Sequence, residues 1–303
     1  MNKIIEIKHL KKYFKDIKAV DDISFNVKKS ELFAFLGVNG AGKSTTINIL
    51  VGVLKKDAGD CYIEGQSIEH IEKILPRIGI VFQNSLLDKK LTVYDNLKYR
   101  AICYELDKDT FNKNLKYLCQ NLELTPLLKR PLHKLSGGQK RKVDIARALI
   151  HMPNILILDE PTTGLDPMTR KLVWNLIEKL QKERHLTVIL TTHYMEEASN
   201  ANYVVIIDHG KIVVEGSPIE LKNLYAFDYL KLYRYDEKII DILDEEKIIY
   251  KKNSSYLEIS FKDTESAKEF IAKYKNLIFD LEIVKGTMDD VFLNVTGKDL
   301  KQL

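Results

Sequence analysis

Residues 32–45 read LFAFLGVNGAGKST, and this stretch decides the fold. Its first five residues are a continuous apolar run, which is typical of a short parallel strand buried on both faces. A glycine-rich turn follows, and from Lys43 onward Ile47 and Leu50 are apolar at helical spacing. A buried strand, a glycine-rich loop and a helix in this order predict a loop that binds phosphate groups.

The chemistry of this loop follows from its residue types. Glycines let successive backbone N–H groups turn inward around an anion, and the next helix presents its N-terminus to the same anion. We expect Lys43 to reach the β- and γ-phosphates of ATP and the Ser44 hydroxyl to bind Mg²⁺. The predicted ATP-binding residues here are Gly37, Val38, Asn39, Gly40, Ala41, Gly42, Lys43, Ser44 and Thr45.

A second buried strand ends in two carboxylates. Residues 154–160 read NILILDE, so Asp159 and Glu160 follow an apolar run. In an open α/β sheet, ligands lie beyond the carboxyl ends of the strands. We therefore expect Asp159 to hold Mg²⁺ through water and Glu160 to polarise the attacking water as a general base. Taken alone, the pair also fits two solvated acids at a strand end.

The pentapeptide LSGGQ at residues 135–139 resembles the signature of the ATP-binding cassette (ABC) superfamily. Small residues here open a helix in which Val143, Ala146 and Ile150 share one face, and a helix N-terminus of this kind is a second anion site. The resemblance implies a head-to-tail dimer, with each ATP between the phosphate loop of one chain and the signature of the other. The implied ATP-binding residues are Ser136, Gly137, Gly138 and Gln139.

The resemblance assigns roles to four further residues. Gln83 follows the apolar run 78–82 and matches the glutamine that senses Mg²⁺ and the attacking water. His193 matches the histidine that contacts the γ-phosphate, which implies a catalytic role beside Glu160 and Gln83. Asp166 matches the loop residue that faces the partner chain, and Tyr13 matches the aromatic that stacks on adenine.

The composition excludes several classes of protein. The chain has 303 residues, of which 45% are hydrophobic and 30% charged, as in an ordinary globular protein. It contains no run of eighteen apolar residues and no apolar segment of the secretory kind near its start. The three cysteines are widely spaced, which indicates reduced thiols, and the net charge of +4 does not indicate a nucleic-acid partner. We expect a cytoplasmic protein.

Glycine usage divides the chain into two predicted domains. Twelve of the fourteen glycines lie at or before Gly216, so the chemistry is expected in the first part. We predict an ABC ATP-binding domain over residues 1–222, with a helical subdomain at about 84–134, and a small α+β accessory domain over 223–303. The predicted fold class is α/β, a phosphate-loop NTPase core with an antiparallel β subdomain.

Shorter patterns predict individual elements. Alternating apolar residues indicate antiparallel strands at 4–7 and 23–27, and apolar spacing at Leu97, Ala101 and Ile102 indicates a helix after Thr92. In the second domain we expect strands at 229–232 and 256–261, a helix at 265–274 and a helix start at Thr287 with Asp290.

The resemblance implies the ATP-hydrolysing, Mg²⁺-dependent subunit of an ABC transporter. Residues 19–25, 192–198 and 287–293 are similar to ATPase subunits of bacterial drug and antibiotic exporters. The implied partners are a second copy of the chain and a separately encoded membrane permease, which would hold the chain at the inner face of the membrane. The helical subdomain should receive a cytoplasmic helix of that permease. Two alternatives stay open: a non-transport ABC ATPase acting on the ribosome or DNA, and the ATPase of an importer.

Overall fold

The structure is a computed structural model that describes residues 3–297. The chain forms two compact units, one ending at Ile212 and the other beginning at Val213. Our boundary after residue 222 separates an ATP-binding from an accessory domain by function, and it stays a prediction. Within the described residues, no helix combines the length and apolar character needed to cross a membrane.

A six-stranded sheet forms the centre of the first unit. Its order is β10-β9-β3-β8-β7-β6, and the strands from β9 to β6 are parallel to their neighbours. The two apolar runs predicted as buried strands are confirmed, because every residue of β3 and β7 is buried. Every residue of β8 is buried as well. The strands are β3 (Leu32–Leu36), β6 (Ile78–Val81), β7 (Ile155–Asp159), β8 (Thr187–Thr192), β9 (Tyr203–Asp208) and β10 (Lys211–Gly216).

An antiparallel sheet of order β2-β1-β4-β5 confirms the predicted β subdomain. Its first two strands extend beyond the predicted alternating patterns, and several irregularities interrupt the register between them. The Phe25 ring lies 5.2 Å from that of Phe33 and 5.3 Å from that of Phe35, which joins this sheet to β3 in one apolar core. The strands are β1 (Lys3–Phe14), β2 (Ile17–Lys28), β4 (Ala58–Ile63) and β5 (Gln66–Ser67).

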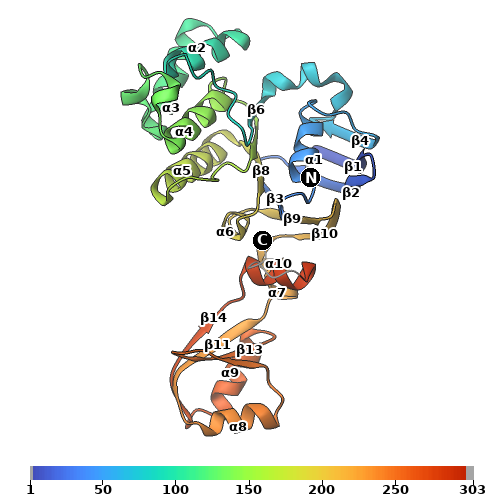
Figure 1. Cartoon of the computed structure of the whole chain (residues 1–303), viewed down its shortest axis with the longest axis vertical. Coiled ribbons are helices and arrows are strands. Elements are labelled where there is room, and N and C mark those ends of the chain that lie inside the picture. Colours follow the sequence, from blue (N-terminus) through green and yellow to red (C-terminus); the bar gives the residue numbers. More distant parts are fainter. Residues whose placement is uncertain (1–2, 298–303) are drawn as a thin grey trace. The chain divides into compact units, whose positions relative to one another are not determined.

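Helices α1 to α5 of the first unit lie in two groups, and α6 lies apart from them against β3 and β8 (Figure 1). Helix α1 contacts β2 and β7, whereas α2, α3, α4 and α5 contact one another away from the antiparallel sheet. The α-helices are α1 (Lys43–Leu50), α2 (Val93–Cys103), α3 (Lys108–Leu122), α4 (Gly137–Leu149), α5 (Pro167–Arg184) and α6 (Met195–Ser199). Short 3₁₀ helices are η1 (Ile68–Lys73), η2 (Leu75–Arg77), η3 (Thr125–Leu127) and η4 (Leu132–Lys134).

The helical subdomain begins as its sequence predicts, with one correction. The Thr92 side chain accepts a hydrogen bond from the backbone N–H of Asp95 and so caps α2. Leu97 and Ala101 are buried, but Ile102 is 55% exposed. Adjacent residues of a helix point in directions about 100° apart, so Ile102 does not share the face of Ala101.

The second unit is an α+β fold with its own core. Its antiparallel sheet has the order β12-β13-β11-β14, and Leu230, Leu232 and Ile259 are among the buried residues between sheet and helices. The predicted helix start is confirmed, since the Thr287 side chain accepts from the Asp290 N–H. Its elements are α7 (Pro218–Tyr225), β11 (Asp228–Tyr235), α8 (Lys238–Glu245), β12 (Tyr250–Lys252), β13 (Leu257–Phe261), α9 (Thr264–Lys273), β14 (Ile278–Val284) and α10 (Met288–Thr296).

Candidate functional site

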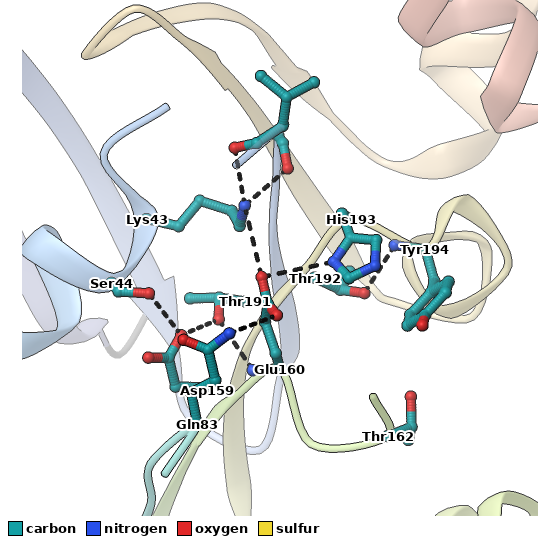
Figure 2. A network of polar contacts seen from close by, with 12 residues as sticks. Lys43, Ser44, Gln83, Asp159, Glu160, Thr162, Thr191, Thr192, His193 and Tyr194 are labelled. Carbon is teal, nitrogen blue, oxygen red and sulfur yellow. Dashed lines mark hydrogen bonds and ion pairs between the residues drawn. The ribbon is translucent and has the colours of Figure 1, made fainter. Parts of the chain in front are cut away.

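Six of the predicted residues come together where β3, β6, β7 and β8 end (Figure 2). Parallel pairing sets this arrangement, because it aligns Asp159 of β7 with Thr191 of β8, and Leu36 of β3 with Thr192. The residues that follow each strand therefore emerge at one edge of the sheet. The six are Lys43, Ser44, Gln83, Asp159, Glu160 and His193, and we call them the polar cluster.

Lys43 is the cation of the polar cluster, and its side chain is only 4% exposed. Its Nζ donates to the carbonyl oxygens of Gly37, at 2.7 Å, and Val38, at 3.0 Å, and lies 3.9 Å from Glu160 Oε1. Burial lowers the pKa of Lys43, while the charges of Glu160 and Asp159 act in the opposite direction. The Lys43 ammonium group thus lies against the phosphate loop, beside the first turn of α1.

The loop before Lys43 leaves the N-terminus of α1 open. Gly42 has a φ of 111°, and a Cβ there would overlap the carbonyl oxygen of Ala19, so the position requires glycine. No side chain caps α1, in contrast to α2 and α4. Asn39 and Gly40 are exposed, and Thr45 is half-buried in the first turn. The free N–H groups of this turn suit a phosphate group.

The oxygen atoms beside α1 suit Mg²⁺. Ser44 Oγ donates to Asp159 Oδ1 at 3.0 Å, and Thr191 Oγ1 donates to the same oxygen at 2.5 Å. Over residues 3–297, no group of three or more His, Cys, Asp or Glu side chains could enclose a metal ion. Mg²⁺ at sites of this kind is bound by one or two protein oxygens together with substrate phosphates. The donor set therefore fits Mg²⁺ brought in with a nucleotide.

Glu160 occupies the centre of the polar cluster and is 7% exposed. Its backbone has a φ of 48°, and its N–H donates to both the carbonyl and the hydroxyl oxygen of Thr191 at 3.1 Å. Gln83 Nε2 donates to Glu160 Oε2 at 3.2 Å, and His193 Nδ1 lies 3.4 Å from Oε1. A carboxylate held from several sides in this way can accept a proton from a water at the phosphate site.

Arg141 of α4 is a residue of this site that the sequence analysis missed. Its guanidinium is 8% exposed and donates only to backbone carbonyls. It bonds Phe82 at 2.6 Å, Glu160 at 2.7 Å, Pro161 at 2.7 Å and Asp159 at 3.0 Å. One side chain thus holds the backbone immediately before Gln83 and on both sides of Glu160. Arg141, Asp144 and Arg147 are spaced by three residues in the helix that the signature opens, and this spacing is the signal that could have marked it.

The signature residues form a second group, separate from the polar cluster. Ser136 caps α4, and its hydroxyl and the Gln139 side chain satisfy each other's backbone N–H groups. Ser136 and Gly137 are exposed, and a Cβ on Gly138 would lie 3.6 Å from Asp166 Oδ2. Asp166 in turn caps α5, and hydrogen bonds from Thr169 lower its pKa. Their hydrogen bonds stay within the starts of α4 and α5.

Tyr13 lies on β1, across from Lys18 of β2. Its hydroxyl donates to Asp21 Oδ1 at 2.8 Å, and Lys18 Nζ is 5.8 Å from the centre of its ring. The strand continues from Lys18 to Ala19, whose carbonyl faces Gly42. Tyr13 is thus connected to the phosphate loop through β2 but makes no hydrogen bond with the polar cluster among the described residues.

Known proteins resemble this chain in sequence and fold. The model of the ABC transporter family matches residues 20–163. The Nod factor export ATP-binding protein I of Ralstonia nicotianae is 32% identical to the chain, over 98% of the chain and 95% of the relative. The chain belongs to the ABC transporter ATP-binding family. The family membership identifies this ABC ATPase as an ATP-hydrolysing subunit of a transporter.

Solved ABC structures agree with this ABC ATPase in fold. The cbiO1 structure from Clostridium perfringens, part of the ABC transporter complex cbiONQ, covers 73% of the chain and 91% of its own, with a TM-score of 0.66 and 33% identity. A post-hydrolysis dimer of the ATP-binding cassette MJ0796 with ADP and Pi covers 70% and 98%, with a TM-score of 0.65 and 28% identity. The predicted α/β ABC fold is confirmed.

Proposed function

We propose that the polar cluster is the catalytic half-site of ATP hydrolysis. Lys43 binds the β- and γ-phosphates, and the N–H groups of the phosphate loop surround the β-phosphate. Ser44 and Asp159 hold Mg²⁺ together with Gln83, and the ion supplies charge neutralisation on the phosphates when it is bound. The convergence of these side chains at one sheet edge is the observation that carries the proposal.

The protein's own groups act on the attacking water. Glu160 accepts the proton of the water, and Gln83 and His193 orient the Glu160 carboxylate through the contacts described above. Lys43 now lies near Glu160, so phosphate binding moves the ammonium toward the nucleotide and frees the carboxylate for the proton. His193 then contacts the γ-phosphate, and Tyr13 stacks on the adenine.

A second copy of the chain completes the site. The signature group, Ser136 to Gln139, presents an exposed helix N-terminus that makes no hydrogen bond to the polar cluster of its own chain. Two phosphate-binding features in one chain and one ATP per cluster favour a head-to-tail dimer with two ATP molecules between the copies. Asp166, at the start of α5, would face the partner copy. The dimeric MJ0796 structure with ADP and Pi supports this proposal by analogy.

Two variants test the site and the dimer. Glu160→Gln keeps the shape of the side chain but cannot accept the proton, so it should bind ATP without turnover and elute as a dimer with ATP and Mg²⁺ in gel filtration. Lys43→Ala should abolish turnover, because it removes a charge contact to the γ-phosphate. The control is Lys56→Ala, a partly buried lysine paired with Glu69. A monomeric Glu160→Gln protein or an active Lys43→Ala protein would refute these assignments.

The transporter partner is a separate membrane permease, and the direction of transport is export. The likeness to the Nod factor export protein supports export, since it extends over 98% of the chain and so includes the second unit. This permease holds the chain at the inner face of the membrane, and residues 223–303 serve as an accessory domain. A permease that drives export when it is reconstituted with this chain and ATP tests the direction.

Exposed apolar residues on the helical subdomain support the docking of the permease there. Tyr99 and Ile102 lie one turn apart on α2 and are more than half exposed, as is Leu86. The segment after Leu86 is bound to α2, because the Asn96 side chain bonds the backbone of Asp88. Tyr99→Glu should weaken co-purification with the permease, whereas Val53→Glu, an equally exposed position, should not.

A further inference from the structure

Glu197 is a buried carboxylate near the polar cluster that the proposed reaction does not use. It lies in α6 and is 3% exposed. One carboxylate oxygen accepts the hydroxyl of Thr162, and the other accepts the hydroxyl of Thr192 at 2.6 Å. Both threonines are also buried. A carboxylate buried in this way is costly unless hydrogen bonds satisfy it, so the two hydroxyls hold it and it holds them.

The two threonines belong to different loops of the site. Thr162 lies in the loop after β7, which begins at Glu160, and its carbonyl accepts from Leu165 N–H at 3.0 Å in the turn before Asp166. Thr192 ends β8 immediately before His193, and its hydroxyl also accepts from Tyr194 N–H at 2.9 Å (Figure 2). Glu197 therefore joins the loop of Asp166 to the loop of His193.

The same link reaches the phosphate loop. The carbonyl of Thr192 accepts from the Gly37 N–H at 3.3 Å, so the strand end that Glu197 holds is bonded to the first glycine of the loop. A displacement of Thr192 would thus move His193 relative to the phosphate site. A displacement of Thr162 would move the turn that carries Asp166.

We propose that Glu197 is a positioning residue that fixes the spacing of these two loops and so couples the two ATP sites of the dimer. This inference rests on the proposed function, in which His193 contacts the γ-phosphate of its own site and Asp166 faces the other copy. A change at one γ-phosphate then passes through Thr192, Glu197 and Thr162 to the partner's site. The carboxylate accepts from both hydroxyls, one at each oxygen, whereas a glutamine amide replaces one of these oxygens with an NH2 group that can only donate, so it cannot reproduce the present pair of bonds.

Steady-state ATP hydrolysis by the full chain tests the link. Glu197→Gln should lower kcat by about tenfold or more, as expected for misplaced catalytic groups, with the KM for ATP within about twofold. Thr162→Val removes the hydrogen bond from Thr162 to Glu197, which links Glu197 to the loop of Asp166, and should reduce the Hill coefficient for ATP. Thr192→Val removes the hydroxyl that bonds Glu197 and the Tyr194 N–H beside His193, and should lower kcat. In the His193→Ala background, Thr192→Val should have no further effect, because it acts through His193.

Controls separate this inference from general destabilisation and from failure of the proposed site. Glu31→Gln alters another buried carboxylate, which accepts from the Lys28 N–H, and should leave kcat and the Hill coefficient unchanged. Lys43→Ala reports on the site itself, so turnover in that variant refutes the proposed function and not the role of Glu197. The inference is overturned if Glu197→Gln keeps wild-type kcat and cooperativity, or if both threonine variants match wild type while Glu197→Gln does not.

Discussion

Lys43 and Arg141 are two buried cations whose hydrogen bonds serve different purposes: those of Lys43 can be replaced by a ligand, whereas those of Arg141 hold the backbone. Lys43 donates to two carbonyls of a loop that has free N–H groups nearby, so an incoming phosphate can replace those contacts. The planar guanidinium of Arg141 donates hydrogen bonds to four backbone carbonyls, so its donors are already engaged and are not directed at a ligand. The lysine is therefore placed to bind, whereas the arginine is placed to hold Glu160 and Gln83.

The first prediction concerns Arg141→Lys. A lysine has one ammonium at its tip, which cannot reach carbonyls as far apart as those of Phe82 and Pro161. Each carbonyl left unpaired in the interior should cost about 1–3 kcal/mol of unfolding free energy. The unfolding free energy measured in urea and kcat should both fall. Arg77→Lys, at an exposed ion pair with Glu64, should change neither quantity. Equal behaviour of the two variants would contradict the role of Arg141.

The second prediction concerns the pH dependence of stability. His151 stacks on Tyr104 with ring centres 3.7 Å apart, and burial, aided by the charges of Arg100 and Arg147, lowers its pKa to about 4. Between pH 6.5 and 4 the unfolded chain binds a proton at His151 that the folded chain does not. Acidification through this window therefore lowers the unfolding free energy.

His151→Phe keeps the stacked ring and removes this titration. From pH 7 to pH 4.5 the variant should lose about 2 kcal/mol less unfolding free energy than the wild type in urea titrations. Between pH 7 and pH 9 the two proteins should change in parallel, since His151 is neutral in both states. If the unfolding free energies of the wild type and the variant fall equally on acidification, His151 must bind its proton as readily in the folded chain as in the unfolded chain.

At the scale of elements, the approach of β6 to α4 decides where Gln83 lies. A Cβ on Gly79 of β6 would overlap the carbonyl of Ala148 in α4 and lie 2.9 Å from a ring carbon of Pro153. Gly79→Ala should therefore push the strand off the helix and cost about 1–3 kcal/mol, as other overpacked sites do. Its kcat should fall because Gln83 moves with β6.

Gly216→Ala is the matched control for this third prediction. A Cβ there meets its nearest atoms at 3.4 Å or more, which is ordinary contact. Thermal unfolding and ATP turnover of this variant should equal those of the wild type. If Gly79→Ala behaves in the same way, β6 and α4 must have room to separate, and the close approach would not set the position of Gln83.

The elements also show what could be predicted from the sequence. Continuous apolar runs predicted β3 and β7, because strands buried on both faces have few polar residues to interrupt them. Cap chemistry predicted the starts of α2 and α10, and the small residues of the signature predicted the start of α4. Strand β14 was missed, although Phe279, Leu281 and Ile283 alternate with the acidic residues Asp280 and Glu282 as in a strand. The strand lies at the edge of its sheet, and Phe279 and Leu281 are exposed there along with both acidic residues.

At the site, the contacts between residues far apart in the sequence could not be predicted. Motifs predicted the residues that meet in the polar cluster, because parallel strand ends bring together whatever follows them. The role of Arg141 depends on carbonyls 18 to 59 residues away along the chain, and that of Glu197 on a threonine 35 residues away. Backbone carbonyls have no residue type, so a side chain that bonds them leaves no partner to find in the sequence.

At the scale of the whole molecule, the two units have separate apolar cores. The first core joins the antiparallel sheet, α1 and the six-stranded sheet, and the second lies between β11, β13, α8 and α9. Separate cores allow separate cooperative unfolding, which is the usual basis for independent transitions in a chain of this size. The residues proposed to bind ATP all lie in the first unit.

The fourth prediction follows from this separation. Calorimetry should show two unfolding transitions. ATP with Mg²⁺ should raise the unfolding temperature of the first unit only, because binding adds about 2.7 kcal/mol to its unfolding free energy at a hundredfold excess of ATP over Kd. Leu232→Ala empties part of the second core, costing about 2–5 kcal/mol, and should lower the other transition only. Leu10→Ala, equally buried in the first unit, should do the reverse. A single transition that ATP and both variants shift together would mean that the units unfold as one, so that the second core stabilises the ATP site directly.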